Sequence, residues 1–268
     1  MPTDVLLILS GLLAGVFGAL LGLGGGILIV PILTLGFGVP LTTAVGTSLI
    51  CVIATSTGAA ALNVRAGRAD VRLGITLGAG TVVGAATGGV VAGILPERVL
   101  AGLFAALLVY TAITMLRGLR GTRATDDGAP VDPAADDGPS APAYRERRVP
   151  AAVGGSFLAG NVSGLLGIGG GVVTVPLIHL VMGAPMRVAV ATSNYMIGLT
   201  AAAGAYAYLF RGDVDPRIAA PVVLGVAAGA AAGAAVGSRF RTSWLIVLFA
   251  VVVLYVAFQM GMRAVGGS

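Results

Sequence analysis

A glycine cluster interrupts the first apolar segment of the chain. The segment runs from Val5 to Val39 without a charged side chain; it holds Gly-Leu-Gly-Gly-Gly at residues 22–26, with a proline five residues further on. A single helix of that length would reach about 50 Å, whereas the hydrocarbon core of a bilayer is about 30 Å thick. Glycine loses much entropy in a helix and proline lacks an N–H donor, so we predict a helix break at this cluster.

The same interrupted segment occurs a second time, 145 residues later. From Gly15 to Ser48, 16 of 34 positions are identical to their partners, which indicates an internal duplication. In lipid, broken backbone is tolerated only where it is buried in protein or lines a wet cavity. Paired interrupted segments also point to the binding site of a secondary transporter. The predicted site residues at the two breaks are Gly22, Gly24, Gly25, Gly26 and Pro31, with Gly167, Gly169, Gly170, Gly171 and Pro176.

Composition places the chain among membrane proteins. Apolar residues make up 57% of the 268 residues, charged residues only 10%, and glycine occurs 43 times. The basic residues are all arginine and lie between the apolar segments, so the net charge of +5 concerns orientation and lipid contact rather than nucleic-acid binding. A single cysteine excludes an internal disulfide framework. We predict an integral all-α polytopic membrane protein without cofactor or metal.

The chain divides into two repeats and a linker. Residues 1–120 form the first repeat and 149–268 the second, each with a broken first segment and three spans, whereas the acidic, proline-rich stretch 121–148 is typical of a disordered linker. Glycines four residues apart mark one span of each repeat and predict close helix packing, with oligomerisation through these faces as a further option. These glycines are Gly80, Gly84 and Gly88, with Gly225, Gly229 and Gly233. The remaining predicted spans are Leu41–Leu62, Leu73–Leu95, Val99–Leu116, Val188–Leu209, Ile218–Gly237 and Trp244–Met260.

The glycine cluster does not fit a nucleotide-binding loop. A Walker loop needs Lys-Ser/Thr after the glycines, and a dinucleotide fingerprint needs alternating strands and helices. Here Ile27-Leu28 and Val172-Val173 follow, inside apolar runs. The two interpretations that remain are tight helix packing and a substrate site.

Polar residues follow each break at matched positions. Thr47 and Ser48 correspond to Thr192 and Ser193, and Asn194 comes next. Such hydroxyls can satisfy themselves on carbonyls of the preceding turn. Because they occur as a pair beside the breaks, they are also candidate ligand donors. The only histidine, His179, could be proton-linked, although a hydrogen-bonded structural role is the alternative.

Acidic residues are missing from the middle of the predicted spans. Outside residues 117–148, the acids lie only at span ends: Asp4, Asp70, Glu97, Asp213 and Asp215. A cation pathway or a carboxylate proton relay usually has a buried acid. An anion needs none, because helix N-termini offer partial positive charge and free N–H groups. The sequence therefore favours a small anionic substrate.

Both halves closely resemble the TauE/SafE (sulfite exporter, TSUP) membrane transporters. The residues that carry the resemblance are Gly-x-Gly-Gly-Gly, the Val-Pro that follows, and Ala-Val-x-Thr-Ser further on. The resemblance covers nearly the whole chain except the linker, which is longer and more acidic than expected. It implies a transporter, generally an exporter, of sulfite, organosulfonates or similar small anions in a bacterial or archaeal cell membrane. The alternatives are a passive anion channel and a transporter of small carboxylates; a membrane enzyme is disfavoured because no catalytic cluster is present.

The arginine distribution predicts the topology. If the broken segment enters and returns to one side, the repeats are inverted; if it makes one net crossing, they are parallel. Loops at corresponding positions of the two repeats differ in their number of arginines. The loop with more arginines belongs alternately to the second and the first repeat along the chain. Only inverted repeats place all the more basic loops on one side, as the positive-inside rule requires. We predict inverted repeats with a cytoplasmic linker and both termini periplasmic or extracellular.

Overall fold

The computed structural model describes residues 2–21, 25–65, 67, 69–121, 149–236 and 242–266, and these form helices without a strand. The predicted all-α polytopic class is confirmed, since six described helices are long and apolar enough to cross a membrane. The predicted linker, residues 121–148, lies outside the described residues except for Gly121. In chain order the first half contains α1 (Pro2–Leu21), α2 (Gly26–Pro31), the π-helical η1 (Ile32–Gly36), α3 (Leu41–Arg65), α4 (Val71–Ala92) and α5 (Glu97–Gly121).

The second half has the same order of elements. It contains α6 (Val149–Leu166), α7 (Gly171–Pro176), the π-helical η2 (Leu177–Val181), α8 (Met186–Arg211), α9 (Pro216–Val236) and α10 (Thr242–Gly266). The six candidate spans are α3, α4 and α5 with α8, α9 and α10. The three spans predicted after each break are therefore present in both halves.

The helix breaks fall on the glycines, whereas the prolines continue the helix. Gly25 precedes α2 with a φ of 74°, a left-handed conformation that favours glycine. Pro31, however, is the last residue of α2, and its φ of −64° is right-handed helical. Pro176 occupies the same place at the end of α7, with a φ of −58°. The prediction that proline contributes to the break was wrong: a φ near −65° suits a helix, and the wider turn of η1 or η2 follows directly.

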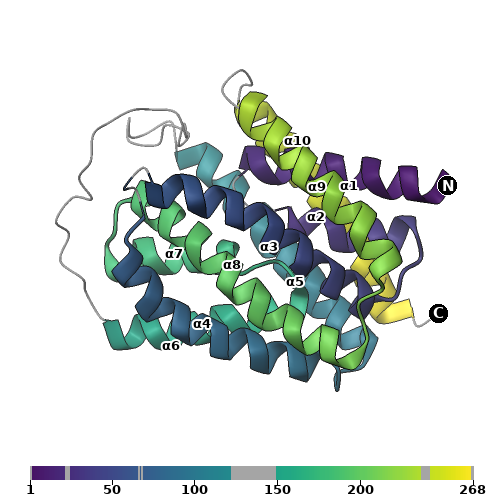
Figure 1. Ribbon diagram of the computed structural model, residues 1–268, viewed down its shortest axis with the longest axis horizontal. Coiled ribbons are helices and arrows are strands. Elements are labelled where there is room, and N and C mark those ends of the chain that lie inside the picture. The colour runs from purple at the N-terminus through teal and green to yellow at the C-terminus, as the bar shows by residue number, and fades with distance from the viewer. Residues whose placement is uncertain are drawn as a thin grey trace.

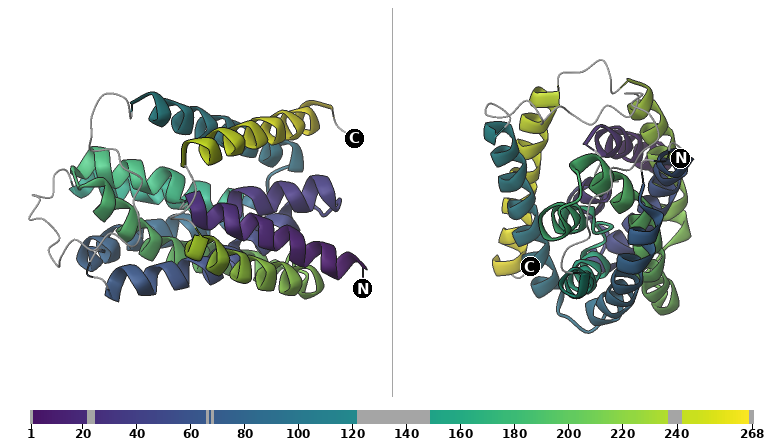
Figure 2. Two further views of the ribbon diagram at one scale, coloured as in Figure 1. Left: turned by 90° about the horizontal axis from the view of Figure 1, so that it is seen from above. Right: turned by 90° about the vertical axis from the view of Figure 1, so that its left-hand side faces the viewer.

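Each broken segment folds as a hairpin that enters the molecule and returns. Figure 2 shows α1 running inward from the end that carries the N-terminus, and α2 with η1 turning back toward that end. The second hairpin, α6 with α7 and η2, enters from the opposite end. The start of α1 and the end of α10 thus share one end of the molecule, and the end of α5 and the start of α6 share the other (Figures 1 and 2). We call these the terminal end and the linker end.

The long arm of each hairpin packs on a helix of the other repeat. A side chain on Gly84 of α4 would overlap the carbonyl oxygen of Phe157 in α6, and one on Gly229 of α9 would overlap that of Leu12 in α1. Glycine is required at these crossings because the backbones touch. Both predicted glycine faces are thus covered within one chain, which removes these positions as contacts between two copies.

Matched helices of the two repeats lie side by side and run in opposite directions. On α3, Gly46 contacts Tyr208 of α8, and Leu49 contacts Gly204. The residue numbers along α3 rise while those of the contacted residues on α8 fall, so the two helices are antiparallel. The pair α5 and α10 behaves alike, because Gly102 near the start of α5 meets Ala264 near the end of α10. Repeats related by an axis along the membrane normal would have parallel partners, whereas an axis in the membrane plane gives antiparallel ones.

Candidate functional site

The two glycine breaks meet near the middle of the molecule, against α3. A β-carbon on Gly26 would lie only 2.9 Å from the carbonyl oxygen of Gly167, so the two backbones are in contact there. A β-carbon on Gly167 would in turn lie 2.9 Å from the carbonyl oxygen of Val45 on α3. Gly26 and Gly167 therefore lie in backbone contact, and neither position leaves room for a side chain.

Ser48 of α3 joins the two breaks. Its Oγ lies 2.8 Å from the carbonyl oxygen of Gly167 and 3.1 Å from that of Gly26. A hydroxyl has one proton, so it donates to one of these carbonyls at a time. The side chain is completely buried, with 0% of its surface exposed. Ser48 thus links the two breaks through the carbonyl groups of Gly26 and Gly167.

The second break is a run of left-handed glycines that leads into α7. Gly167, Gly169 and Gly170 have φ angles of 73°, 79° and 79°. The hydrogen bonds of α7 begin when the amides of Val173 and Thr174 donate to the Gly170 carbonyl, at 3.0 Å and 2.9 Å. The amides before Val173 are those that a helix N-terminus directs outward. In the first break, Gly25 caps α2 in the same way, while Gly22 and Gly24 lie outside the described residues.

Two buried hydroxyls face the second break without a hydrogen-bond partner among the described residues. Ser193 Oγ would be 3.8 Å from a β-carbon on Gly171, and Ser163 Oγ 3.4 Å from one on Gly170. A buried hydroxyl without a partner costs about 1–3 kcal/mol, so natural proteins rarely keep one without a reason. These two donors and the first amides of α7 converge on the same small region.

The other predicted site residues lie farther along the same elements. Thr192 is buried on α8, where its Oγ1 accepts a hydrogen bond from the amide of Asp70 at 3.0 Å. Its partner Thr47 is buried on α3, and its Oγ1 has no partner in the described part of the chain. Asn194 is half-buried next to Ser193. His179 Nδ1 lies 2.8 Å from the Ala184 carbonyl oxygen, and this contact joins η2 to the turn after it. A hydrogen bond of this kind is the structural role considered for His179 in the sequence.

Sequence reasoning missed two residues that shape the second break. Ser163 is matched by Gly18 in the first repeat, so the duplication gave no signal for it. Tyr208, matched by Asn63, is buried on α8, and its hydroxyl lies 3.0 Å from the carbonyl oxygen of Gly164. This contact fastens the end of α6 where the break begins. Its only sequence signal was a large polar side chain near the end of a span.

The described part of the chain contains no cluster of side chains that could bind a metal ion. No group of three or more His, Cys, Asp or Glu residues is close enough there to hold a metal ion. The groups that do converge are amides, hydroxyls and carbonyls.

The family model for the sulfite exporter TauE/SafE matches residues 7–260. The chain belongs to this family. It is 27% identical over 263 residues to the probable membrane transporter protein YunE of Bacillus subtilis, covering 96% of each chain. It is 31% identical over 210 residues to a probable membrane transporter protein of Methanocaldococcus jannaschii, covering 76% of this chain and 72% of the relative. No solved structure matches the chain significantly. This TauE/SafE protein is an integral membrane transporter and not an enzyme.

The matched serines of this TauE/SafE protein allow a direct comparison of structural and binding roles. Ser48→Ala should lower the free energy of unfolding by about 1–3 kcal/mol, because it leaves buried carbonyls without their donor. Ser193→Ala loses no hydrogen bond of the protein and removes a buried hydroxyl without a partner, so it should keep the free energy of unfolding or raise it by up to about 1–3 kcal/mol. If Ser193 donates to the anion, Ser193→Ala should instead raise the KM of transport about tenfold. Thermal unfolding in detergent and transport in proteoliposomes measure both; a destabilised Ser193→Ala with normal KM would contradict the assignment.

Proposed function

We propose that the chain is a secondary transporter, an exporter in the cell membrane, of small sulfur-containing oxyanions such as sulfite or organosulfonates. The substrate site lies at the paired glycine breaks, beside the first amides of α7. The observation that carries this proposal is the convergence of the first amides of α7 with the buried hydroxyls of Ser163 and Ser193, which have no partner among the described residues.

The charge distribution supports an anion rather than a cation. The described acidic residues lie at helix ends or in loops, away from the breaks. They are Asp4, Asp70, Glu97, Asp213 and Asp215. An anion at the breaks would receive N–H and O–H donors in a site of low dielectric, where such bonds are strong. A cation there would meet no carboxylate among the described residues. The sulfur-containing class follows from the family, whose printed name is sulfite exporter.

Unequal contacts at the two ends favour a transporter over a passive channel. At the linker end, Thr192 accepts a hydrogen bond from the amide of Asp70 in the loop between α3 and α4. The matched pair at the terminal end is Thr47 and Asp215, and the Oγ1 of Thr47 has no partner among the described residues. Thr47 and Asp215 are close enough to form this contact, because their chain neighbours touch: a β-carbon on Gly46 would lie 2.9 Å from a side-chain carbon of Val214. The threonine contact is thus present at the linker end, and the matched contact of Thr47 is missing at the terminal end among the described residues. We propose that the opposite-facing state exchanges these two contacts.

Variants of the two threonines should shift this exchange in opposite directions. Thr192→Val removes the hydrogen-bond acceptor of the contact present here, and Thr47→Val removes that of the proposed opposite state. A net hydrogen bond is worth about 1 kcal/mol, so each variant should change the ratio of the two states about fivefold. The ratio of the KM values measured from the two sides of oriented proteoliposomes reports this change. A shift of both variants in the same direction would overturn the exchange.

Transport in proteoliposomes tests the proposed function itself. The purified chain is reconstituted and loaded with sulfite, thiosulfate, an organosulfonate or a small carboxylate, and counterflow of the labelled anion is followed. Counterflow with at least one sulfur oxyanion, accelerated by the same anion on the other side, supports a transporter. Flux that depends only on the gradient and shows no counterflow would identify a channel, and preference for carboxylates would overturn the substrate class.

A further inference from the structure

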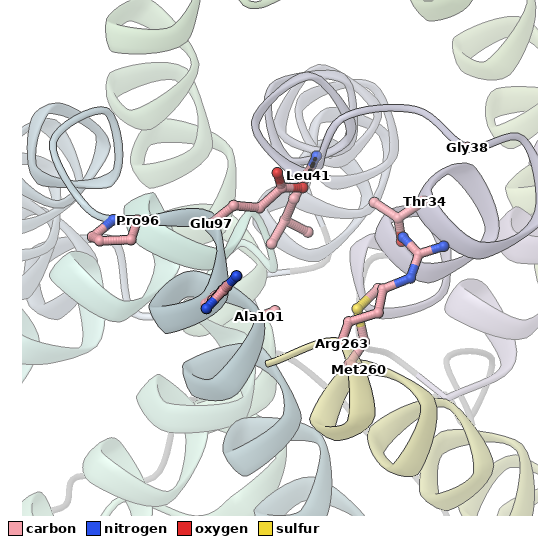
Figure 3. A pocket seen from close by; sticks show the side chains of 9 residues that line it. Thr34, Gly38, Leu41, Pro96, Glu97, Ala101, Met260 and Arg263 are labelled. Atoms are coloured by element: carbon pink, nitrogen blue, oxygen red, sulfur yellow. Dashed lines mark hydrogen bonds between the residues drawn. The ribbon is translucent and has the colours of Figure 1, made fainter. Parts of the chain in front are cut away.

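A cleft of about 520 Å³ opens at the terminal end, away from the glycine breaks. Its walls come from η1 with the turn after it, the start of α5 and the end of α10, as Figure 3 shows. The charged side chains that line it are Glu97 and Arg98 of α5 and Arg263 of α10. Figure 3 places the Arg263 side chain across the cleft beside Thr34 of η1. The cleft therefore lies against the outer end of the first hairpin.

The charge of the cleft is positive and is not neutralised from within. Glu97 Oε1 accepts a hydrogen bond from the amide of Leu41 at 3.2 Å, so the carboxylate is engaged by the first turn of α3. Among the described residues, the structure pairs neither Arg98 nor Arg263 with a carboxylate. Both arginines are exposed. Two guanidinium groups thus face one carboxylate that already has a donor.

The duplication provides an internal comparison for these charges. The positions matched to Glu97, Arg98 and Arg263 are Thr242, Ser243 and Gly118, none of which is charged. The helices that carry them, α5 and α10, are present in both repeats. A charge at these exact positions is therefore not a common feature of the two repeats, although Arg241 precedes Thr242 and Arg117 precedes Gly118 in the sequence.

We propose that this cleft is a second, peripheral anion site, which holds a small sulfonate or sulfite-like anion at the terminal mouth of the pathway. Guanidinium groups suit such a site because they form paired, charge-assisted hydrogen bonds to oxyanions. A positive mouth also raises the local concentration of the anion at this end. That the anion passes on to the glycine breaks rests on the proposed function; its binding at the mouth does not.

A cysteine reporter measures the local potential without any transport. Pro96 is exposed and lines the cleft, so Pro96→Cys is made in a Cys51→Ala background. Its rates of modification are compared for anionic sulfonatoethyl methanethiosulfonate and cationic trimethylammonioethyl methanethiosulfonate. Arg98→Gln with Arg263→Gln should lower the anionic-to-cationic rate ratio about tenfold. Arg217→Gln removes an exposed arginine at the start of α9, which does not line the cleft, and should leave the ratio unchanged.

Competition by a free anion distinguishes a binding site from a merely positive surface. Ethanesulfonate should slow modification of the reporter when both arginines are present and have no effect in the double variant. The experiment is repeated in liposomes of phosphatidylcholine alone and with phosphatidylglycerol. Protection in both supports the site; protection that phosphatidylglycerol abolishes would assign the arginines to lipid headgroups and overturn it, as would an unchanged rate ratio.

Two further measurements keep this result separate from the central site. In a Gly170→Val background, which should block the glycine breaks, the protection by ethanesulfonate should persist. In the otherwise unchanged chain, Arg263→Gln should raise the KM for an anion offered at the terminal end about tenfold while the KM from the linker end stays the same. This readout also replaces the labelling if Pro96→Cys fails to fold. Equal KM changes from both ends would contradict a peripheral site.

Discussion

Gly170→Val is expected to abolish transport while leaving the protein in the membrane. Gly170 has a φ of 79°, and a β-carbon there would lie 3.2 Å from Ser163 Cβ and 3.4 Å from its Oγ. The branched side chain would occupy the space in front of α7, where the first amides and Ser163 converge. Losing one oxyanion donor costs enzymes about a hundredfold in rate, and this variant blocks several donors, so activity should fall at least that far.

The control for backbone strain is Gly183→Val. Gly183 also has a positive φ, 73°, but a β-carbon there meets nothing within 4 Å. It therefore carries the same conformational penalty for a branched residue without entering the site. Gly25→Val, in the first break, should behave like Gly170→Val, because its β-carbon would lie 3.2 Å from the Ala14 carbonyl oxygen. Full activity in either break variant, or an equal loss in Gly183→Val at equal membrane levels, would reject the backbone site.

The sequence predicted the fold as far as local chemistry determines it. The glycine breaks, the six spans and the charged loops follow from runs of apolar residues and from glycine's left-handed conformation at Gly25 and Gly170. Pro31 was misjudged because its φ of −64° is compatible with a helix, and the chain continues from it directly into η1. The start of α4 was placed two residues late, since the side chain of Asp70 caps the helix by accepting from the Leu73 amide at 3.0 Å.

The site depends on contacts that no local pattern contains. The duplication pairs Ser48 with Ser193, but the structure gives them different surroundings: Ser48 donates to carbonyls of the two breaks, and Ser193 has no partner among the described residues. That difference arises from how the two breaks meet at α3. Ser163 could not be found by comparing repeats, because glycine takes its place in the first one. The glycine faces were likewise predicted as packing surfaces, but their partners, the long arms of the opposite hairpins, are a tertiary property.

The topology remains our proposal, and two independent observations support it. Matched helices α3 and α8 run antiparallel, as do α5 and α10, which is the relation that an axis in the membrane plane produces. The hairpins in Figure 2 also enter and return at opposite ends, so each broken segment makes no net crossing. The arginine pattern then orients the molecule, because the more basic loop of each matched pair belongs on the cytoplasmic side.

Reporter fusions should therefore give all-or-none results of opposite sign at two positions. Alkaline phosphatase fused after Ser268 should be active and a fluorescent protein there dark, because the arginine pattern orients the inverted repeats with the C-terminus outside. Both reporters inserted between residues 121 and 149 should show the reverse, with a cytoplasmic linker.

Moving the excess of arginine tests the cause: replacing Arg65 and Arg72, which lie in or beside the loop between α3 and α4, should lower the fraction of correctly oriented protein. Cytoplasmic activity of the fusion after Ser268 with an external linker would reverse the orientation, and a linker on the same side as the C-terminus would exclude the inverted repeats themselves.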